Sequence, residues 1–409
     1  MVGCGLSLVA QAVEITSKNT VGTLISGTVW DGGVAPGSND VAVWSTSGNT
    51  SSGNALGGDA SWQGIKVAAA INRDITMNAS GAETLTLGSA GIDMSAVPTD
   101  PTRRKFTINP KVDLGAAQTW NVAESSTGPA VNPRFLTVAG VISGGSGSKL
   151  TKSGTGTLTL EGANTFSGGV NLDQGVLLVN TDTALGSGTL RISNGTTIGA
   201  LGNQVKTLAN QVVVNGNFTM GQTTKKALTL SGTMDLGGST RTITMGNTFG
   251  NLISGNISNG GLIKDGAYTL TLSGSNDYAT GTTVSMGTLI GGADNAFGIG
   301  DITVASGATL VLTNGVSNDY INDLAKLVLG GSSALSLDFT GADTVAGLSL
   351  NGGTTWLSAG TYSAAALSGQ GGGTYTGTGM ITVIPEPATI GMLGLGALIT
   401  VMIRRMRNS

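Results

Sequence analysis

Short apolar or alternating runs recur along the chain, and most of them follow a glycine. Examples are Thr-Leu-Thr-Leu at residues 157–160, Val-Leu-Leu-Val at 176–179, Thr-Leu-Arg-Ile at 189–192, Thr-Leu-Ile at 288–290 and Ala-Thr-Leu-Val-Leu at 308–312. Runs of this length that are rich in Val, Leu, Ile and Thr are typical of β-strands. The pattern therefore predicts an all-β chain of short strands joined by glycine and asparagine turns.

The strand pattern is repeated inside the chain. Residues 150–190 align without gaps with residues 262–302, at an offset of 112 (262 − 150). Phe166 is replaced conservatively by Tyr278. Identical residues at equivalent positions include Lys152 and Lys264, Gly154 and Gly266, Gly162 and Gly274, Asn164 and Asn276, Gly169 and Gly281, Gly175 and Gly287, Asp182 and Asp294, and Gly186 and Gly298. We call residues 150–190 the first copy and residues 262–302 the second copy.

The spacing of the glycines that precede strands indicates the architecture. Gly156 and Gly175 lie about 20 residues apart, as do Gly287 and Gly307, which is the size of one coil of a parallel β-helix. The offset between the two copies would then span about five coils of roughly 22 residues. We therefore predict a parallel β-solenoid over residues 13–383, filled by stacked Val, Leu and Ile.

A β-sandwich series with modules of about 110 residues is the alternative architecture. It requires hairpin turns between strands that are adjacent in the chain, and Asn-Gly pairs favour such turns. The chain has Asn-Gly pairs at Asn194-Gly195, Asn215-Gly216, Asn259-Gly260, Asn314-Gly315 and Asn351-Gly352.

Composition limits the chemistry that the chain can perform. The 409 residues include 68 Gly, no His and one Cys (Cys4), and the formal net charge is −3. The absence of a basic stripe argues against nucleic-acid binding. A chain without histidine has no Ser-His-Asp triad and no imidazole metal site, and without a cysteine in the body it has no thiolate site. We therefore predict no nucleic-acid partner, no metal site and no cofactor.

Carboxylates and tryptophans are the remaining candidates for a site. Glycoside hydrolysis needs two carboxylates about 5–10 Å apart, and the acids show no tight cluster in the sequence. Asp182 and Asp294 occupy equivalent positions in the two copies, which favours a turn role through side-chain-to-backbone hydrogen bonds. The other acids considered are Asp173, Asp301, Asp338 and Asp343. The tryptophans could stack on sugars but are more typical of core or cap positions: Trp30, Trp44, Trp62, Trp120 and Trp356.

The N-terminal segment is apolar. Residues 1–12 end in Ala10-Gln11-Ala12, the small-x-small pattern of a signal-peptide cleavage site, so we predict a signal peptide or its remnant. The segment lacks a basic start, which leaves room for a true start upstream of Met1. An ordinary first strand and a lipoprotein box at Cys4 are the alternatives.

The C-terminal segment has an apolar stretch followed by basic residues. Residues 388–403 carry no charge and would span about 24 Å as a helix, against ~30 Å for the hydrocarbon core. Arg404, Arg405 and Arg407 follow, and the positive-inside rule places them in the cytoplasm. We predict a single C-terminal transmembrane helix. A simple tail anchor and a buried core helix are the alternatives.

The C-terminal 25 residues resemble a known sorting domain. Residues 383–389 (VIPEPAT), the Gly-rich apolar stretch and the terminal arginines are similar to the PEP-CTERM sorting domain of Gram-negative, exopolysaccharide-making bacteria. The resemblance implies that residues 384–409 are a sorting and anchor segment with Pro385, Glu386 and Pro387 as its motif. It further implies processing by an exosortase-type enzyme, after export by Sec and a transient stay in the inner membrane.

The body resembles a second family. Residues 152–169 (KSGTGTLTLEGANTFSGG) are very similar to the autotransporter-associated β-strand repeat of secreted passenger domains, and residues 264–281 match it more weakly. Residues 30–44 look like the opening segment of such passengers, and residues 359–362 and 377–383 look like their closing strands. No run of amphipathic membrane strands follows the repeats, so we expect the terminal span to stand where a barrel would otherwise be.

Together these features predict a non-enzymatic exported protein with a structural or adhesive role at the cell surface or in the extracellular matrix, alongside exopolysaccharide. The alternative is a polysaccharide-binding or polysaccharide-degrading β-helix protein. An acidic cluster on one face of the solenoid would favour this alternative. A third possibility is a protein that stays anchored in the membrane, facing the periplasm.

Overall fold

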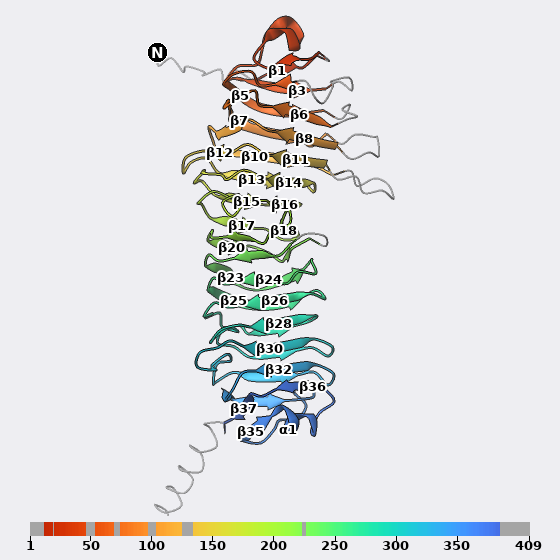
Figure 1. Ribbon diagram of the computed structural model, residues 1–409, viewed down its shortest axis with the longest axis vertical. Helices are drawn as coiled ribbons and strands as arrows, with labels where there is room; N and C mark the ends of the chain where they lie inside the picture. Colours follow the sequence, from red (N-terminus) through yellow and green to blue (C-terminus); the bar gives the residue numbers. More distant parts are fainter. Residues whose placement is uncertain are drawn as a thin grey trace, which may run out of the picture. The chain divides into compact units, whose positions relative to one another are not determined.

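The computed structural model describes residues 12–18, 20–45, 54–68, 74–96, 104–124, 134–222 and 226–384. The chain forms two compact units, and each is built of short strands stacked in successive coils (Figure 1). The first unit comprises Met1–Met234 and Gly246–Asn251, and the second unit comprises Asp235–Met245 and Leu252–Ser409. Each unit is an all-β parallel solenoid, as the sequence predicts.

The elements of the first unit are short strands and two 3-10 turns. They are β1 (Val13–Thr16), β2 (Gly22–Thr23), η1 (Gly27–Val29), η2 (Asp31–Gly33), β3 (Asp40–Trp44), β4 (Asn54–Ala55), β5 (Ala60–Val67), β6 (Ile75–Asn78), β7 (Thr84–Met94), β8 (Arg104–Ile108), β9 (Lys111–Leu114), β10 (Gln118–Val122), β11 (Arg134–Val138), β12 (Ile142–Ser143), β13 (Leu150–Ser153), β14 (Thr157–Leu160), β15 (Val170–Leu172), β16 (Val176–Val179), β17 (Leu190–Ile192), β18 (Thr196–Ala200), β19 (Lys206–Leu208), β20 (Val212–Val214), β21 (Phe218–Met220) and β22 (Leu228–Leu230).

The boundaries between the units fall within β23 (Met234–Met245) and β24 (Asn251–Ile253). The second unit continues with β25 (Ile257–Asp265), β26 (Thr269–Leu272), β27 (Thr282–Val284), β28 (Thr288–Gly291), β29 (Ile302–Val304), β30 (Thr309–Thr313), β31 (Lys326–Leu329), β32 (Ala334–Asp338), β33 (Ala342–Val345), β34 (Gly347–Ser349), β35 (Gly360–Ser363), α1 (Ala364–Ser368), β36 (Thr374–Gly377) and β37 (Met380–Val383).

Successive coils pair in parallel and in register. In the first copy, Leu150 of β13 pairs with Val170 of β15, which pairs with Leu190 of β17. In the second copy, Leu262 pairs with Thr282 in the same way. The buried Asn164 accordingly reaches Ala184 of the next coil, 20 residues further along the chain. The structure thus confirms a coil of about 20 residues within the two copies, whereas coils nearer the N-terminus are longer, as in the pairing of Gln118 with Leu150.

The core of each coil is a ladder of stacked aliphatic side chains. In the second unit Leu270, Leu289, Leu310 and Leu335 pair in turn across β26, β28, β30 and β32, and each is at most 1% exposed. Along these four strands the leucines point inward, while Thr and Ser point outward. Because every coil adds one such layer, a narrow core of Leu, Val and Ile is enough to bury the apolar surface of both units.

The pairing excludes the β-sandwich alternative. Asn194-Gly195 lies between β17 and β18, but these strands do not pair with each other as a hairpin would require. β17 pairs with β15 and β20, whereas β18 pairs with β16 and β21, all in parallel. The Asn-Gly turn therefore forms a corner of one coil, where the chain passes from one ladder to the next.

Asparagine and glycine hold the corners that need a left-handed backbone, as predicted. Among the described residues, the non-glycine positions with positive φ are all asparagines, namely Asn259, Asn295, Asn314 and Asn318. Gly186 shows why no other residue fits at some corners. Its φ is +61°, and a Cβ there would lie 2.0 Å from the carbonyl oxygen of Phe166.

The second unit ends in a small cap in which β37 pairs in parallel with β33 and antiparallel with β35. Within the residues that the structure describes, no helix has the length and apolar character needed to cross a membrane. The stretch predicted to be a transmembrane helix, residues 388–403, lies outside the described residues, and so do residues 1–11 of the predicted signal peptide. These two interpretations stay predictions.

Candidate functional site

The tryptophans divide into buried and exposed positions. Trp30, Trp44, Trp62 and Trp120 are at most 1% exposed, which confirms the core interpretation for these four. Trp30 packs edge-on against Trp44 and Trp62, with ring centroids 5.6 and 5.9 Å apart. Trp356 alone among the tryptophans is exposed, at 45%, and can meet a ligand.

The six carboxylates considered as catalytic candidates all accept hydrogen bonds from protein donors. These are Asp173 from Ser193, Asp182 from Thr207, Asp294 from Ser317 and Asp319, Asp301 from Lys326, Asp338 from Ser336, and Asp343 from Ile321 and Thr344. Asp182 and Asp294 accept from backbone amides, which confirms the predicted type of bond. However, the donors lie 23–25 residues further along, on the following coil. Asp182 and Asp294 therefore each tie their own coil to the next one.

An acidic cluster does form in the second unit. Asp319 and Asp323 lie near Asp343, and Asp294 acts on Asp319. Burial raises the pKa of Asp343 to about 8, against the opposing effect of the amides of Ile321 and Thr344. Asp343 is 1% exposed and uses both carboxylate oxygens for those amides, so a substrate cannot reach it. In the part of the chain that the structure describes, no group of three or more acids, His or Cys has the geometry of a metal site.

Lys152 is buried inside the first copy. Its side chain is 0% exposed, and its Nζ donates to the carbonyl oxygens of Ser153, Gly154 and Gln174 at 2.8, 2.6 and 3.1 Å. Three acceptors match the three hydrogens of an ammonium group. These hydrogen bonds suit the charged ammonium form, whereas burial disfavours the charge and lowers the pKa of Lys152 to about 7. The lysine therefore fastens the turn after β13 to the following coil.

Lys264 occupies the same place in the second copy. It is also 0% exposed, but its Nζ donates to two carbonyl oxygens, those of Gly266 and Met286, each at 2.6 Å. Burial lowers the pKa of Lys264 to about 8, and the negative charge of Asp265 partly opposes this shift. Sequence reasoning noted the two equivalent lysines but missed their internal role. Their recurrence in a chain with few charges was the available signal.

Two equivalent asparagines bridge three coils each. Asn164 Oδ1 accepts from the amide of Ile142 at 2.7 Å, and its Nδ2 donates to the carbonyl of Ala184 at 2.6 Å. Asn276 makes the same two bonds with Ile257 and Ala296 at the same distances. Both side chains are buried, so each satisfies backbone groups that water cannot reach.

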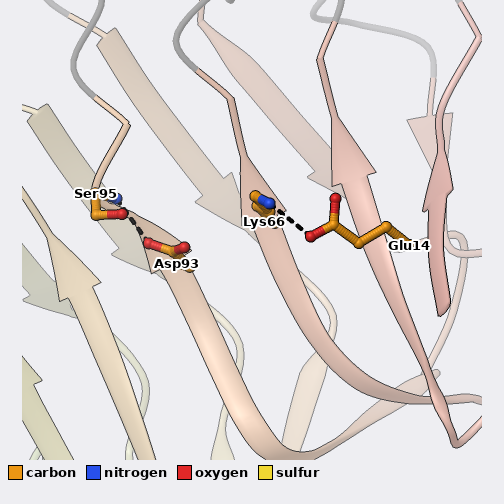
Figure 2. A network of polar contacts seen from close by, with 4 residues as sticks. All are labelled: Glu14, Lys66, Asp93 and Ser95. Atoms are coloured by element: carbon orange, nitrogen blue, oxygen red, sulfur yellow. Dashed lines mark hydrogen bonds and ion pairs between the residues drawn. The ribbon is translucent and has the colours of Figure 1, made fainter. Parts of the chain in front are cut away.

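Polar contacts also lie on the surface of the first unit. Figure 2 shows Glu14 on β1, Lys66 on β5 and Asp93 on β7; β3 pairs between β1 and β5, and β5 pairs with β7. Lys66 Nζ lies 2.5 Å from Glu14 Oε1, and Asp93 Oδ1 accepts from the amide of Ser95 at 2.8 Å. Both carboxylates meet donors of the protein, so this patch shows no sign of a catalytic arrangement.

A pocket in the second unit surrounds the exposed tryptophan. Its volume is about 160 Å³. The pocket is lined by Lys326, Ala346, Gly347, Trp356, Leu357, Ala359, Val383 and Ile384. The Nζ of Lys326 lies 5.2 Å from the centroid of the Trp356 ring. An indole beside an ammonium group can bind an apolar or proline-rich segment with a negative charge, or an acidic sugar.

The residues predicted for sorting lie outside the described residues. These are Pro385, Glu386 and Pro387 in the motif and Arg404, Arg405 and Arg407 after the apolar stretch. The structure describes the chain as far as Ile384, whose amide donates to the carbonyl of Val345 at 3.1 Å. The motif begins at the next residue in the sequence, Pro385.

Comparison with protein families identifies two kinds of segment. Residues 150–179 and 262–290 each match the passenger-associated-transport-repeat, so both copies carry it at equivalent positions. Residues 383–407 match the PEP-CTERM protein-sorting motif. The second match covers Pro385, Glu386, Pro387 and the basic residues that follow the apolar stretch.

A curated relative supports the first of these matches. The chain is 30% identical over 206 residues to the adhesin BmaC autotransporter of Brucella suis biovar 1 (strain 1330). The aligned region is 47% of this chain but 6% of that protein. No solved structure matches the chain. The chain thus combines passenger-associated-transport repeats with a PEP-CTERM sorting motif.

Proposed function

We propose that the protein is an exported structural or adhesive component of the cell surface or extracellular matrix of a Gram-negative bacterium. The observation that carries this proposal is the presence, in one chain, of two passenger-associated-transport repeats and a PEP-CTERM motif at residues 383–407. The motif supports sorting through an exosortase-type enzyme, and the similarity to an adhesin autotransporter supports an adhesive role.

The route has four proposed steps. Residues 1–12 act as a signal peptide or its remnant for Sec export, and residues 388–403 hold the chain in the inner membrane as a helix with Arg404, Arg405 and Arg407 on the cytoplasmic side. Processing at the Pro385-Glu386-Pro387 motif then frees the body, residues 13–383, which works alongside exopolysaccharide. A solenoid suits this role because each coil contacts only its neighbours and presents a similar surface to them and to the solvent.

A non-enzymatic role is supported by how the body uses its polar groups. The carboxylates tie neighbouring coils together, and the buried Lys152 and Lys264 satisfy backbone carbonyls. The alternative, a protein that degrades polysaccharide, is tested by incubating the purified protein with the exopolysaccharide of its host. Release of reducing ends would contradict the non-enzymatic proposal.

The mature C-terminus tests the sorting proposal directly. Mass spectrometry of the protein recovered from the cell surface or the medium is expected to show a chain that ends at or near Pro385-Glu386-Pro387. The control is the Glu386→Ala variant, which is expected to retain the full tail in the membrane fraction. Exported protein with residues 404–409 intact would contradict processing and leave a membrane anchor.

A further inference from the structure

The pocket around Trp356 is built by the fold and is not a chance exposure of one side chain. Gly347 opens β34 directly beneath the indole, and a Cβ at this position would lie 3.1 Å from Trp356 Cε3 and Cζ3. The amide of Leu357 donates to the carbonyl of Leu348 at 2.9 Å, which fixes the segment that carries Trp356 against β34. The Cε3–Cζ3 edge of the indole is thus held against the body, while 45% of the residue stays exposed.

The chain itself leads out of this pocket. Val383, at the end of β37, and Ile384 both line it. The next three residues in the sequence are Pro385, Glu386 and Pro387. An extended chain covers at most about 3.6 Å per residue, so the three residues of the motif can reach no more than about 11 Å from Ile384. They are confined to the neighbourhood of Trp356 and Lys326.

The chemistry of the pocket matches that of the motif. Proline rings in an extended conformation bind well to aromatic surfaces, because little conformational entropy is lost. Each proline also keeps the residue before it extended. Glu386 supplies a negative charge between the two prolines, and Lys326 supplies a positive charge 5.2 Å from the indole centroid. A tether this short gives an effective concentration in the millimolar range or above.

We propose that the Trp356–Lys326 pocket is a docking site for the chain's own Pro385-Glu386-Pro387 motif. Prolines pack on the exposed part of the indole, and the carboxylate of Glu386 pairs with the ammonium group of Lys326. Docking is reversible because an exposed ion pair contributes little. The proposal rests on the sorting role of this motif given above. A docked motif is shielded from the processing enzyme, so the pocket limits the rate at which the tail is removed.

Acrylamide quenching of tryptophan fluorescence tests docking on the full chain in detergent. Trp356 dominates the quenchable signal because the other four tryptophans are at most 1% exposed. The Trp356→Phe variant lacks this ring, so the quenching that it still shows measures the contribution of the other four. Lys326→Glu and Glu386→Lys each replace an attraction by a repulsion. Each is expected to lower the ratio of docked to undocked chain by about twofold to fivefold and so to increase quenching. The charge-swapped double variant Lys326→Glu/Glu386→Lys is expected to restore shielding.

The control is Lys111→Glu, which reverses the charge of an exposed lysine in the first unit and is expected to leave quenching unchanged. Two results would overturn docking: single variants that quench like the parent, or a double variant that quenches like the singles. Shielding of Trp356 by added glucuronic acid in the parent chain, without any effect of the Glu386 variant, would assign the pocket to an acidic saccharide instead.

A second readout separates this proposal from the sorting proposal. In the host, Lys326→Glu keeps the motif intact and is expected to accelerate loss of the tail in a pulse–chase experiment. If the parent chain is never processed, the sorting proposal fails, while the quenching result still decides docking. If the parent is processed and Lys326→Glu does not change the rate, docking has no regulatory role and this inference is wrong.

Discussion

The two repeat copies have the same backbone register but different interiors. Leu150 pairs with Val170 in the first copy as Leu262 pairs with Thr282 in the second. At one equivalent interior position, the first copy has Phe166 where the second copy has Tyr278. The backbone of a coil therefore tolerates a polar or an apolar interior, provided that each buried polar group finds a partner.

The aromatic position shows how such a substitution is accommodated. In the second copy the Tyr278 hydroxyl lies 2.6 Å from Thr282 Oγ1, and Thr282 donates to the carbonyl of Phe297 at 3.0 Å. Since the single threonine hydrogen goes to that carbonyl, Tyr278 is the donor to Thr282. Burial raises the pKa of Tyr278, so its hydroxyl stays protonated. In the first copy Phe166 and Val170 replace both partners, which leaves no polar group to satisfy.

The lysines differ in the number of acceptors that they serve. Lys152 meets three carbonyls and Lys264 two. A neutral amine has two hydrogens, so deprotonation leaves one carbonyl of the Lys152 site without a donor, whereas the two carbonyls at Lys264 can still be served. The hydrogen bonds of the first copy are thus complete only with the ammonium form, although burial favours the neutral amine.

Removing the lysines is expected to give the largest effect. Lys152→Met keeps the aliphatic stem but removes the ammonium donor from three part-buried carbonyls, and we expect the free energy of unfolding to fall by about 3 kcal/mol. Lys264→Met leaves two carbonyls without this donor, and we expect the free energy of unfolding to fall by about 2 kcal/mol. Urea unfolding followed by circular dichroism measures the loss, and amide hydrogen exchange of β13 and β25, the strands that carry the two lysines, locates it, because solenoid coils can open separately.

The matched control for these variants is Lys111→Met, at an exposed position, which is expected to change the free energy of unfolding by less than about 0.5 kcal/mol. Equal losses for Lys152→Met and Lys264→Met would contradict the distinction drawn between the two copies.

Exchanging the aromatic pair is expected to give the next largest effect. Phe166→Tyr brings a hydroxyl into the first copy opposite Val170, and we expect a loss of about 2 kcal/mol for the unsatisfied group. Adding Val170→Thr supplies the partner found in the second copy and is expected to recover most of the loss. A double-mutant cycle on urea unfolding gives the coupling. A double variant no more stable than Phe166→Tyr would show that the polar pair needs other features of the second copy.

The lysine pKa values predict different pH dependence for the two copies. The folded-state pKa of Lys152, about 7, lies below its ordinary value of 10.5, so the unfolded chain binds more protons between these values. Stability contributed by this lysine site therefore rises with pH from about 7 to 10.5 and is lost as pH falls towards 7. For Lys264 the same rise begins at about pH 8.

Urea unfolding of the parent and the two lysine-to-methionine variants between pH 6 and 10 checks these windows. The difference between parent and Lys152→Met is expected to change from about pH 7 upward, and that for Lys264→Met from about pH 8 upward. Asp343 acts with the opposite sign, since its raised pKa of about 8 makes stability fall between 3.8 and 8. It is present in all three chains and cancels in the differences. Coincident onsets for both variants would contradict the prediction.

The smallest effect is expected at the equivalent aspartates. Asp294 accepts from the amides of Ser317 and Asp319, whereas Asp182 accepts from the amide of Thr207. Because both sites are open to water, Asp182→Ala is expected to cost about 0.5 kcal/mol and Asp294→Ala about 1 kcal/mol. Thermal unfolding of the two variants under identical conditions measures the order. If Asp182→Ala loses more stability than Asp294→Ala, the number of amide donors does not determine how much each aspartate contributes.

The sequence alone determined the fold class and the repeat. Glycine-led runs such as residues 157–160 predicted strands that the structure confirms as β14, and glycine spacing predicted the coil length. The sequence also decided that the corners would belong to Gly and Asn, because few other residues adopt positive φ without strain. Local conformational preferences and a short repeat are properties that one segment of chain carries by itself.

Only the tertiary structure decided which polar residues are buried and what they bind. Lys152 reads in the sequence as an ordinary charged residue, yet the following coil brings the carbonyl of Gln174 to its ammonium group, 22 residues away. Likewise, the sequence could not tell Trp356 from the four buried tryptophans, because exposure depends on the strands that pack beside each ring. Such contacts join segments on neighbouring coils, so they exist only once the coils have stacked.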